Sequence, residues 1–185
     1  EVSGQPLYRH AAQALAEGGY DRRLVVVAAN PGGQTVEEQL TELGFGAVHT
    51  STPEQGLLSS FQAAARVLVE HRALAAAAFA LADMPLVGPE HHHELIHTFH
   101  QTQAAAVLSR YGGVVAPPHL FRADLLPELL ALKPADRGPR ELLEQHQGDT
   151  VFVERPADEL LDVDTPDDLT RAARLLQARA RPSSP

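Results

Sequence analysis

The chain has 185 residues, of which 44% are apolar, and it carries a formal net charge of −9 with no cysteine. Such a composition is typical of one globular domain with its own core. It excludes disulfides and Cys-ligated zinc, and its acidity disfavours nucleic acid as a partner. Because there is no apolar run of about 20 residues and no signal-peptide pattern, we expect a cytoplasmic protein without a membrane partner.

Helical and strand-like patterns alternate along the chain. In the first half they predict a helix over 6–17, a strand over 24–29, a helix over 35–43, a strand over 47–50 and a helix over 53–70. The small apolar residues 75–81 fit either a strand or a buried helical turn. In the second half the patterns predict a helix over 89–101, strands over 104–109 and 113–115, helices over 123–132 and 140–146, and a strand over 150–154.

The first strand and the last helix have the clearest local signals. The run LVVVAA is typical of a buried parallel strand, and Asn30-Pro31-Gly32-Gly33 after it is typical of a turn. Thr165 as N-cap, Pro166 at the first helical position and Asp168 two residues later predict the start of the last helix. Residues 181–185 are expected to be a frayed tail. The alternation as a whole predicts an α/β fold with a mainly parallel sheet, whose ligands bind beyond the carboxyl ends of the strands.

Two acidic segments are candidates for binding a metal. Asp83 directly follows the apolar segment 75–81, where a carboxylate can hold Mg²⁺ against a triphosphate. Asp162 and Asp164 lie two apart in an extended segment and therefore point the same way. The alternatives are an ordinary strand-to-helix turn for Asp83 and, for the second segment, acidic residues that complement the dipole of the last helix.

Small residues mark the start of the helix that follows Gly56. Ser59 and Ser60 could let a nucleotide approach the backbone there, although ordinary helix-start chemistry is the stronger explanation from the pattern alone.

The sequence His93-Glu94-Leu95-Ile96-His97 matches the helical motif of zinc metalloproteases, so a zinc hydrolase is an alternative function. No suitable third ligand follows in sequence. We therefore expect a solvent-facing row of histidines, opposite Leu95 and Ile96, without a catalytic zinc.

Four segments together resemble the molybdenum-cofactor guanylyl- and cytidylyltransferases. They are GLLSSFQAAARVL, ADMPLVGPE, PPHLFRADLLPELLALKPADRGPRELL and LLDVDTPDDL, in the same order as in that family. The similarity extends over about residues 3–176. It implies a Rossmann-like, three-layer nucleotidyltransferase fold, with residues 1–180 as one domain.

The resemblance also implies a reaction, in which a nucleotide is transferred from an NTP to a small phosphorylated acceptor such as molybdopterin, with release of pyrophosphate. Mg²⁺ is the implied cofactor, and a molybdoenzyme or a chaperone is an implied partner. The form DVDTPDD favours CTP over GTP. A non-catalytic nucleotide-binding or regulatory relative is the alternative. The implied site residues are Asp83 for catalysis, Asp83, Asp162 and Asp164 for the metal, Asn30, Gly56, Ser59 and Ser60 for the nucleotide, and Asp136 and Arg140 on the acceptor side.

The chain departs from this family at its start. The family opens with a strand and a Gly-rich loop that grips the triphosphate, whereas Glu1 aligns just after that loop, and Lys133, the only lysine, does not replace it. In the family the opening strand lies between those that match 24–29 and 75–81. We therefore expect a gap there that is filled by residues upstream of Glu1, by another chain, or by a changed strand order. We favour the first, and expect residues 1–185 alone not to be a competent transferase.

Overall fold

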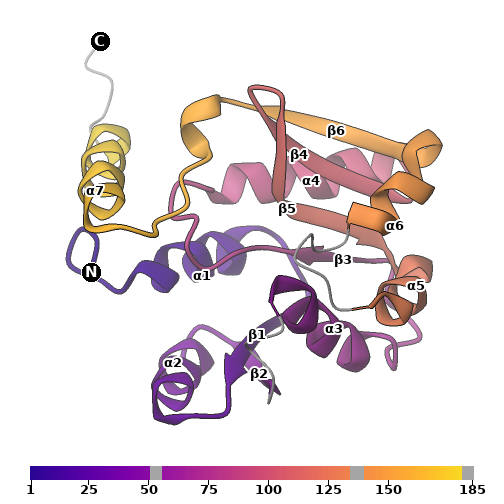
Figure 1. Cartoon of the computed structure of the whole chain (residues 1–185), viewed down its shortest axis with the longest axis horizontal. Helices are drawn as coiled ribbons and strands as arrows, with labels where there is room; N and C mark the ends of the chain where they lie inside the picture. Colours follow the sequence, from indigo (N-terminus) through magenta and orange to yellow (C-terminus); the bar gives the residue numbers. More distant parts are fainter. Residues whose placement is uncertain (51–55, 134–139, 181–185) are drawn as a thin grey trace.

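The computed structural model describes residues 1–50, 56–133 and 140–180. Helices and strands alternate along the chain, as an α/β fold requires (Figure 1). The first half contains α1 (Leu7–Glu17), β1 (Arg23–Ala28), α2 (Pro31–Thr41), β2 (Phe45–Thr50), α3 (Leu57–Leu68) and β3 (Ala76–Phe79). The second half contains α4 (Pro89–Thr102), β4 (Ala106–Tyr111), β5 (Val114–Arg122), α5 (Leu126–Ala131), α6 (Arg140–Gln145), β6 (Thr150–Arg155) and α7 (Pro166–Ala180).

The strands form two separate sheets. β1 and β2 make a parallel pair, and the other four strands follow the order β3-β5-β4-β6. β3 and β4 each pair antiparallel with β5, and β4 pairs parallel with β6, so that β5 alone runs against its neighbours. The expected α/β class with mainly parallel strands is therefore confirmed.

The two sheets are not joined in the part of the chain that the structure describes. β1 pairs only with β2, and β3 pairs only with β5, so each of these strands has a second edge without a strand partner. Figure 1 shows β1 and β2 apart from the larger sheet. The gap between strands 24–29 and 75–81 that the resemblance implies is thus present.

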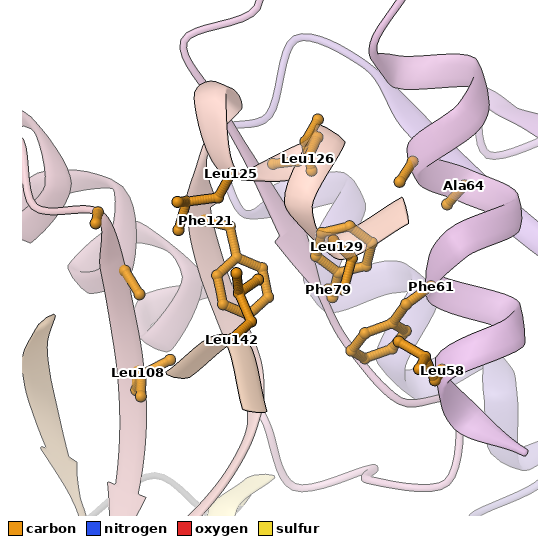
Figure 2. Packing of buried hydrophobic residues seen from close by; sticks show 14 residues of the cluster. Leu58, Phe61, Ala64, Phe79, Leu108, Phe121, Leu125, Leu126, Leu129 and Leu142 are labelled. Atoms are coloured by element: carbon orange, nitrogen blue, oxygen red, sulfur yellow. The ribbon is translucent and has the colours of Figure 1, made fainter. Parts of the chain in front are cut away.

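Helices cover both faces of the four-stranded sheet. On one face, α3 and α5 pack Phe61 and Leu129 against Phe79 and Phe121, with ring centroids of Phe61 and Phe79 4.7 Å apart (Figure 2). On the other face, Leu95 and Phe99 of α4 pack against residues of β4, β5 and β6. The layers helix, sheet and helix therefore enclose the apolar side chains. In the described ranges, no helix has the length and apolarity that crossing a membrane requires.

Two predicted elements differ from those in the structure. The turn expected at Asn30 to Gly33 is the first turn of α2, because the Asn30 side chain accepts a hydrogen bond of 2.9 Å from the Gly33 N–H and Pro31 starts the helix. The short strand expected over 113–115 is the much longer β5. Pro117 and Pro118 lack N–H groups, but the β4–β5 register shifts where they lie, so the ladder tolerates them.

The other predicted elements differ from the observed ones in where they begin or end, or had been left open as to type. α3 begins at Leu57, and residues 51–55, which include the start of the helix expected over 53–70, lie outside the described residues, as does the tail 181–185. The segment 75–81, for which a strand or a helical turn was open, contains the strand β3.

The predicted start of the last helix is confirmed. The Asp168 N–H donates to the Thr165 hydroxyl oxygen over 3.2 Å, and the Thr165 N–H donates to the Asp168 carboxylate over 3.0 Å. These reciprocal bonds satisfy backbone donors that a helix start otherwise leaves without partners.

We expect Thr165→Ala to lower the free energy of unfolding by about 1 kcal/mol, because it removes this cap. Urea denaturation of the purified protein measures the loss. Thr170→Ala is the matched control, since the Thr170 hydroxyl bonds only to the Pro166 carbonyl within the same helix, and its effect should stay within about 0.5 kcal/mol. Equal midpoints for the two variants would show that the cap does not stabilise the fold.

Candidate functional site

Two acidic loops lie against each other. Asp83 lies in the loop after β3, and Asp162 and Asp164 lie in the segment that leads into α7. The backbone N–H of Val163, between the two later aspartates, donates a 3.1 Å hydrogen bond to the backbone carbonyl of Asp83. Segments far apart in sequence are thereby fixed side by side.

A buried ion pair braces the second loop. The Glu159 side chain is nearly inaccessible and accepts two hydrogen bonds of 2.9 Å from the guanidinium of Arg155. Arg179 of α7 lies 3.5 Å from the same carboxylate and donates to the Leu86 carbonyl over 2.6 Å. Arg179 therefore ties α7 to the loops on both sides. We did not predict these residues, although Arg155 and Glu159 have the i, i+4 spacing of a helical ion pair.

Buried apolar side chains next to the aspartates anchor the two loops in the core. Met84 and Val87, which follow Asp83, are buried against Tyr111 of β4. Leu86 packs with Leu161, next to Asp162, in a separate buried cluster. The loops are thus held on the protein by residues adjacent to the aspartates, while Asp162 and Asp164 themselves are exposed.

The electrostatics of the two loops favour a cation. The Oδ1 atom of Asp83 is buried and has no hydrogen-bond partner. Although Asp162 is exposed as a residue, partial burial of its carboxylate, followed by the nearby negative charges of Asp83 and Asp164, raises the pKa of this group above its usual range. A positive ion would satisfy the buried oxygen and offset the repulsion. Mg²⁺ suits such a set, because it typically takes one or two carboxylates and fills its remaining positions with water and phosphate oxygens.

The carboxylates do not already form a closed cage. Over the described ranges, no three side chains of His, Asp or Glu are gathered as a ready set of metal ligands. The arrangement therefore fits a metal that is shared with a phosphate ligand better than one enclosed by protein alone.

Ser59 and Ser60, at the start of α3, lie in different surroundings. Gly56 has φ of +80°, which favours glycine, and the buried Ser59 hydroxyl donates to its carbonyl over 2.8 Å. Ser60 instead lines a cavity that also reaches Leu81 and Ala82, the residues just before Asp83. The cavity therefore extends from the start of α3 to the residues just before Asp83, and Ser60 rather than Ser59 lines it.

Asn30 lies at a different hollow. Its side chain caps α2, and it lines a shallow groove of about 770 Å³ with Gln34, Glu37 and His49. Asn30 therefore does not line the larger cavity, the one that Ser60 and Ala82 line. Asp136 lies outside the described residues, and so does the side chain of Arg140, so the acceptor side stays a prediction.

The histidine row is only partly on the surface. His93 and His97 are exposed, as expected, and the Glu94 carboxylate accepts a 2.9 Å hydrogen bond from Arg155, which disfavours a role as general base. The expectation is wrong for His91 and His92, which are buried. His91 bonds to the Ser109 hydroxyl over 2.8 Å, and burial is the main reason that its pKa falls to about 3.

Comparisons with known proteins agree with this geometry. A family model described as the MobA-like NTP transferase domain matches residues 1–151. No curated protein matches the chain significantly.

Several solved structures share the fold. The Rv0371c protein of Mycobacterium tuberculosis H37Rv is 21% identical, with a TM-score of 0.75 over 94% of this chain and 86% of that one. A second structure of it is a complex with manganese, at 18% identity and a TM-score of 0.67 over 94% and 89% of the two chains. The 4-diphosphocytidyl-2C-methyl-D-erythritol synthase of Anaerococcus prevotii is 13% identical, with a TM-score of 0.78 over 96% and 88%. The molybdopterin-guanine dinucleotide biosynthesis protein A of Archaeoglobus fulgidus is 17% identical, with a TM-score of 0.64 over 96% and 88%. These likenesses confirm the Rossmann-like nucleotidyltransferase fold.

We expect Glu159→Gln to lower the free energy of unfolding by about 3 kcal/mol, because it leaves Arg155 and Arg179 without their buried counter-charge. Glu154→Gln is the matched control, since Glu154, next to Arg155 in β6, makes an exposed pair with Arg110 of β4, and its cost should stay below about 1 kcal/mol. Denaturant titrations compare the two variants. If both variants lose the same small amount, the buried ion pair does not brace the loop.

Proposed function

Because the chain belongs to the MobA-like NTP transferase family, we propose that its activity is the Mg²⁺-dependent transfer of a nucleotide from an NTP to a small phosphorylated acceptor. The observation that carries the proposal is the contact between the two acidic loops, through the hydrogen bond from Val163 to Asp83. It holds side by side the two loops that carry the candidate metal ligands, which supports a shared site for a metal-bound triphosphate beyond the end of β3.

The proposed reaction is an in-line displacement. An oxygen of the acceptor phosphate attacks the α-phosphorus of the NTP and forms a new P–O bond. The bond from the α-phosphorus to the bridging oxygen breaks, and its electron pair leaves with pyrophosphate. No protein nucleophile is needed. When bound, Mg²⁺ neutralises charge on the phosphates and orients their oxygens.

The protein's own residues have distinct proposed roles. Asp83, with its unpartnered buried oxygen, and the Asp162–Asp164 segment hold the metal. Gly56 and Ser60 offer the amino-terminal end of α3 to a phosphate, where backbone N–H groups and the helix dipole favour anions. The buried Ser59 shapes this helix start through its bond to Gly56.

The finer assignments rest on the resemblance. Asn30 is proposed as a further nucleotide contact, and Asp136 and Arg140 as contacts to the acceptor. The sequence DVDTPDD favours CTP over GTP, and molybdopterin is the proposed acceptor, with a molybdoenzyme or a chaperone to receive the product. The manganese complex of the Rv0371c protein supports a divalent ion in this fold.

We expect Asp83→Asn to weaken Mn²⁺-dependent binding of CTP by about tenfold to 100-fold, because it removes a charge from the proposed ligand set. Isothermal titration calorimetry with MnCl₂ and CTP, and then with GTP, measures the loss. Stability should fall by no more than about 1 kcal/mol. Asp158→Asn, an exposed aspartate just before the loop, should bind as the unaltered protein does.

Two outcomes would contradict parts of this proposal. Unchanged Mn²⁺ and CTP binding by Asp83→Asn would remove Asp83 from the site. If the protein binds NTP with normal affinity but releases no pyrophosphate when molybdopterin is present, it is instead a nucleotide-binding relative without transferase activity.

A further inference from the structure

A buried glutamine of α3 binds the end of α5. The Gln62 residue is only 4% exposed, and its amide nitrogen donates hydrogen bonds to the carbonyls of Leu129 over 3.0 Å and Leu132 over 2.8 Å. A longer bond of 3.4 Å reaches the Leu130 carbonyl. These carbonyls belong to the last turn of α5 and to the residue at which that helix ends. One side chain of α3 is therefore a donor to the end of a second helix.

The end of α5 depends on this side chain for its donors. The last carbonyls of a helix have no partners within it and need donors from elsewhere. At the ends of α1, α3 and α4, the backbone N–H of the cap residue supplies one, from Gly18, Val69 and Gln103. In the described part of the chain, Leu132, the cap residue of α5, makes no such bond and has extended backbone angles instead. Gln62 supplies donors here, because its amide nitrogen carries two N–H groups.

The hydrogen bonds of Gln62 add direction to an apolar contact. Leu129 of α5 and Phe61 of α3 belong to one buried cluster (Figure 2), and so does Leu142 of α6. Apolar packing is not directional, whereas hydrogen bonds are. The side chain of Gln62 therefore fixes where along α3 the helix α5 ends. The chain between Leu132 and Leu142 is thus attached beside α3 at one end by hydrogen bonds and at the other by burial.

The same helix α3 carries proposed contacts to the nucleotide. Gly56 and Ser60 are the proposed phosphate contacts, and Ser60 precedes Gln62 by two residues. Asp136 and Arg140, the proposed acceptor contacts, follow the end of α5 in the sequence. Gln62 therefore connects the two groups of contacts. Its backbone belongs to the helix that would hold the nucleotide, and its side chain binds the helix end from which the acceptor segment starts.

We propose that Gln62 is a positioning residue, which sets the distance between the bound nucleotide and the acceptor by fixing the end of α5 on α3. This role rests on the proposed transferase function. Gln62 touches neither substrate, so its loss should leave nucleotide binding intact and impair the step in which the two phosphates meet. That step is sensitive to distance, because the reacting atoms must come within about 3–3.5 Å, and a misplacement of about 1 Å can cost about 100-fold in rate.

Substitution of Gln62 by methionine tests the proposal, because methionine has a similar length and shape but no N–H donor. The rate is measured as pyrophosphate release from CTP with Mg²⁺ and varied molybdopterin. For Gln62→Met we expect kcat/KM for molybdopterin to fall about tenfold to 100-fold. The dissociation constant of CTP in the presence of Mn²⁺, from isothermal titration calorimetry, should stay within about twofold of that of the unaltered protein. A general loss of stability would instead change both quantities.

Gln103→Met is the matched control. The Gln103 amide donates to the carbonyls of Phe99 and His100, each over 3.3 Å. It therefore also closes a helix end, but the end of its own helix, α4. This variant should leave both the rate and the CTP affinity unchanged. If Gln62→Met does not fold, Gln62→Asn takes its place. Its amide is one methylene shorter and does not reach all three carbonyls, and the same split between rate and affinity is expected.

Three results would overturn the positioning role. The first is an unchanged kcat/KM for molybdopterin in the Gln62 variant. The second is a parallel loss of CTP affinity, and the third is an equal loss of rate in Gln103→Met, because both would indicate general destabilisation. Failure of the proposed function has a different signature, since the unaltered protein itself would then release no pyrophosphate. Gln62 would in that case have no acceptor to position, and its role would fall with the function.

Discussion

The hydrogen bond from the Val163 N–H to the Asp83 carbonyl is the interaction on which the candidate site depends. It joins the loop after β3 to the segment before α7, and so brings three carboxylates into each other's electrostatic field. The mutual repulsion of these carboxylates is unfavourable in an acidic protein unless other interactions offset it. The Glu159–Arg155 pair and the bonds of Arg179 hold the loops in place against that repulsion. The fold thus stabilises a concentration of negative charge that a bound cation would relieve.

The divided sheet is the second constraint on the molecule. β3 ends at the loop of Asp83, and the cavity between β3 and β1 reaches Ser60 near the start of α3. The cavity is also lined by Leu81 and Ala82, the residues just before Asp83.

Local patterns predicted the elements whose causes are local. The apolar run of β1, the amphipathic spacing of α4 and the cap at Thr165 each depend on residues within a few positions of one another, and each element is confirmed. The expectation that β1 is buried is wrong for all of its residues except Val27. The length of β5 could not be predicted, because Pro117 and Pro118 are tolerated only through a shift in the pairing with β4.

Long-range contacts explain what the sequence could not show. His91 is buried because Ser109, on a strand distant in sequence, supplies a partner for its ring. Periodicity contains no information on such a pair, nor on the bond between Arg179 and Leu86. The adjacency of Asp83 to the Asp162–Asp164 segment likewise came from the resemblance to a family and not from spacing. Where both partners lie within one helical turn, as at Thr165 and Asp168, the sequence alone was sufficient.

The most direct test of the site is a crystal structure of the protein with Mn²⁺ and a non-hydrolysable CTP analogue, with the ion located by its anomalous scattering. The account predicts one ion about 2.1 Å from a carboxylate oxygen of Asp83 and in contact with Asp162 or Asp164, with its other positions filled by phosphate oxygens and water. An ion bound instead at His93 and His97, or a nucleotide bound away from both acidic loops, would contradict it.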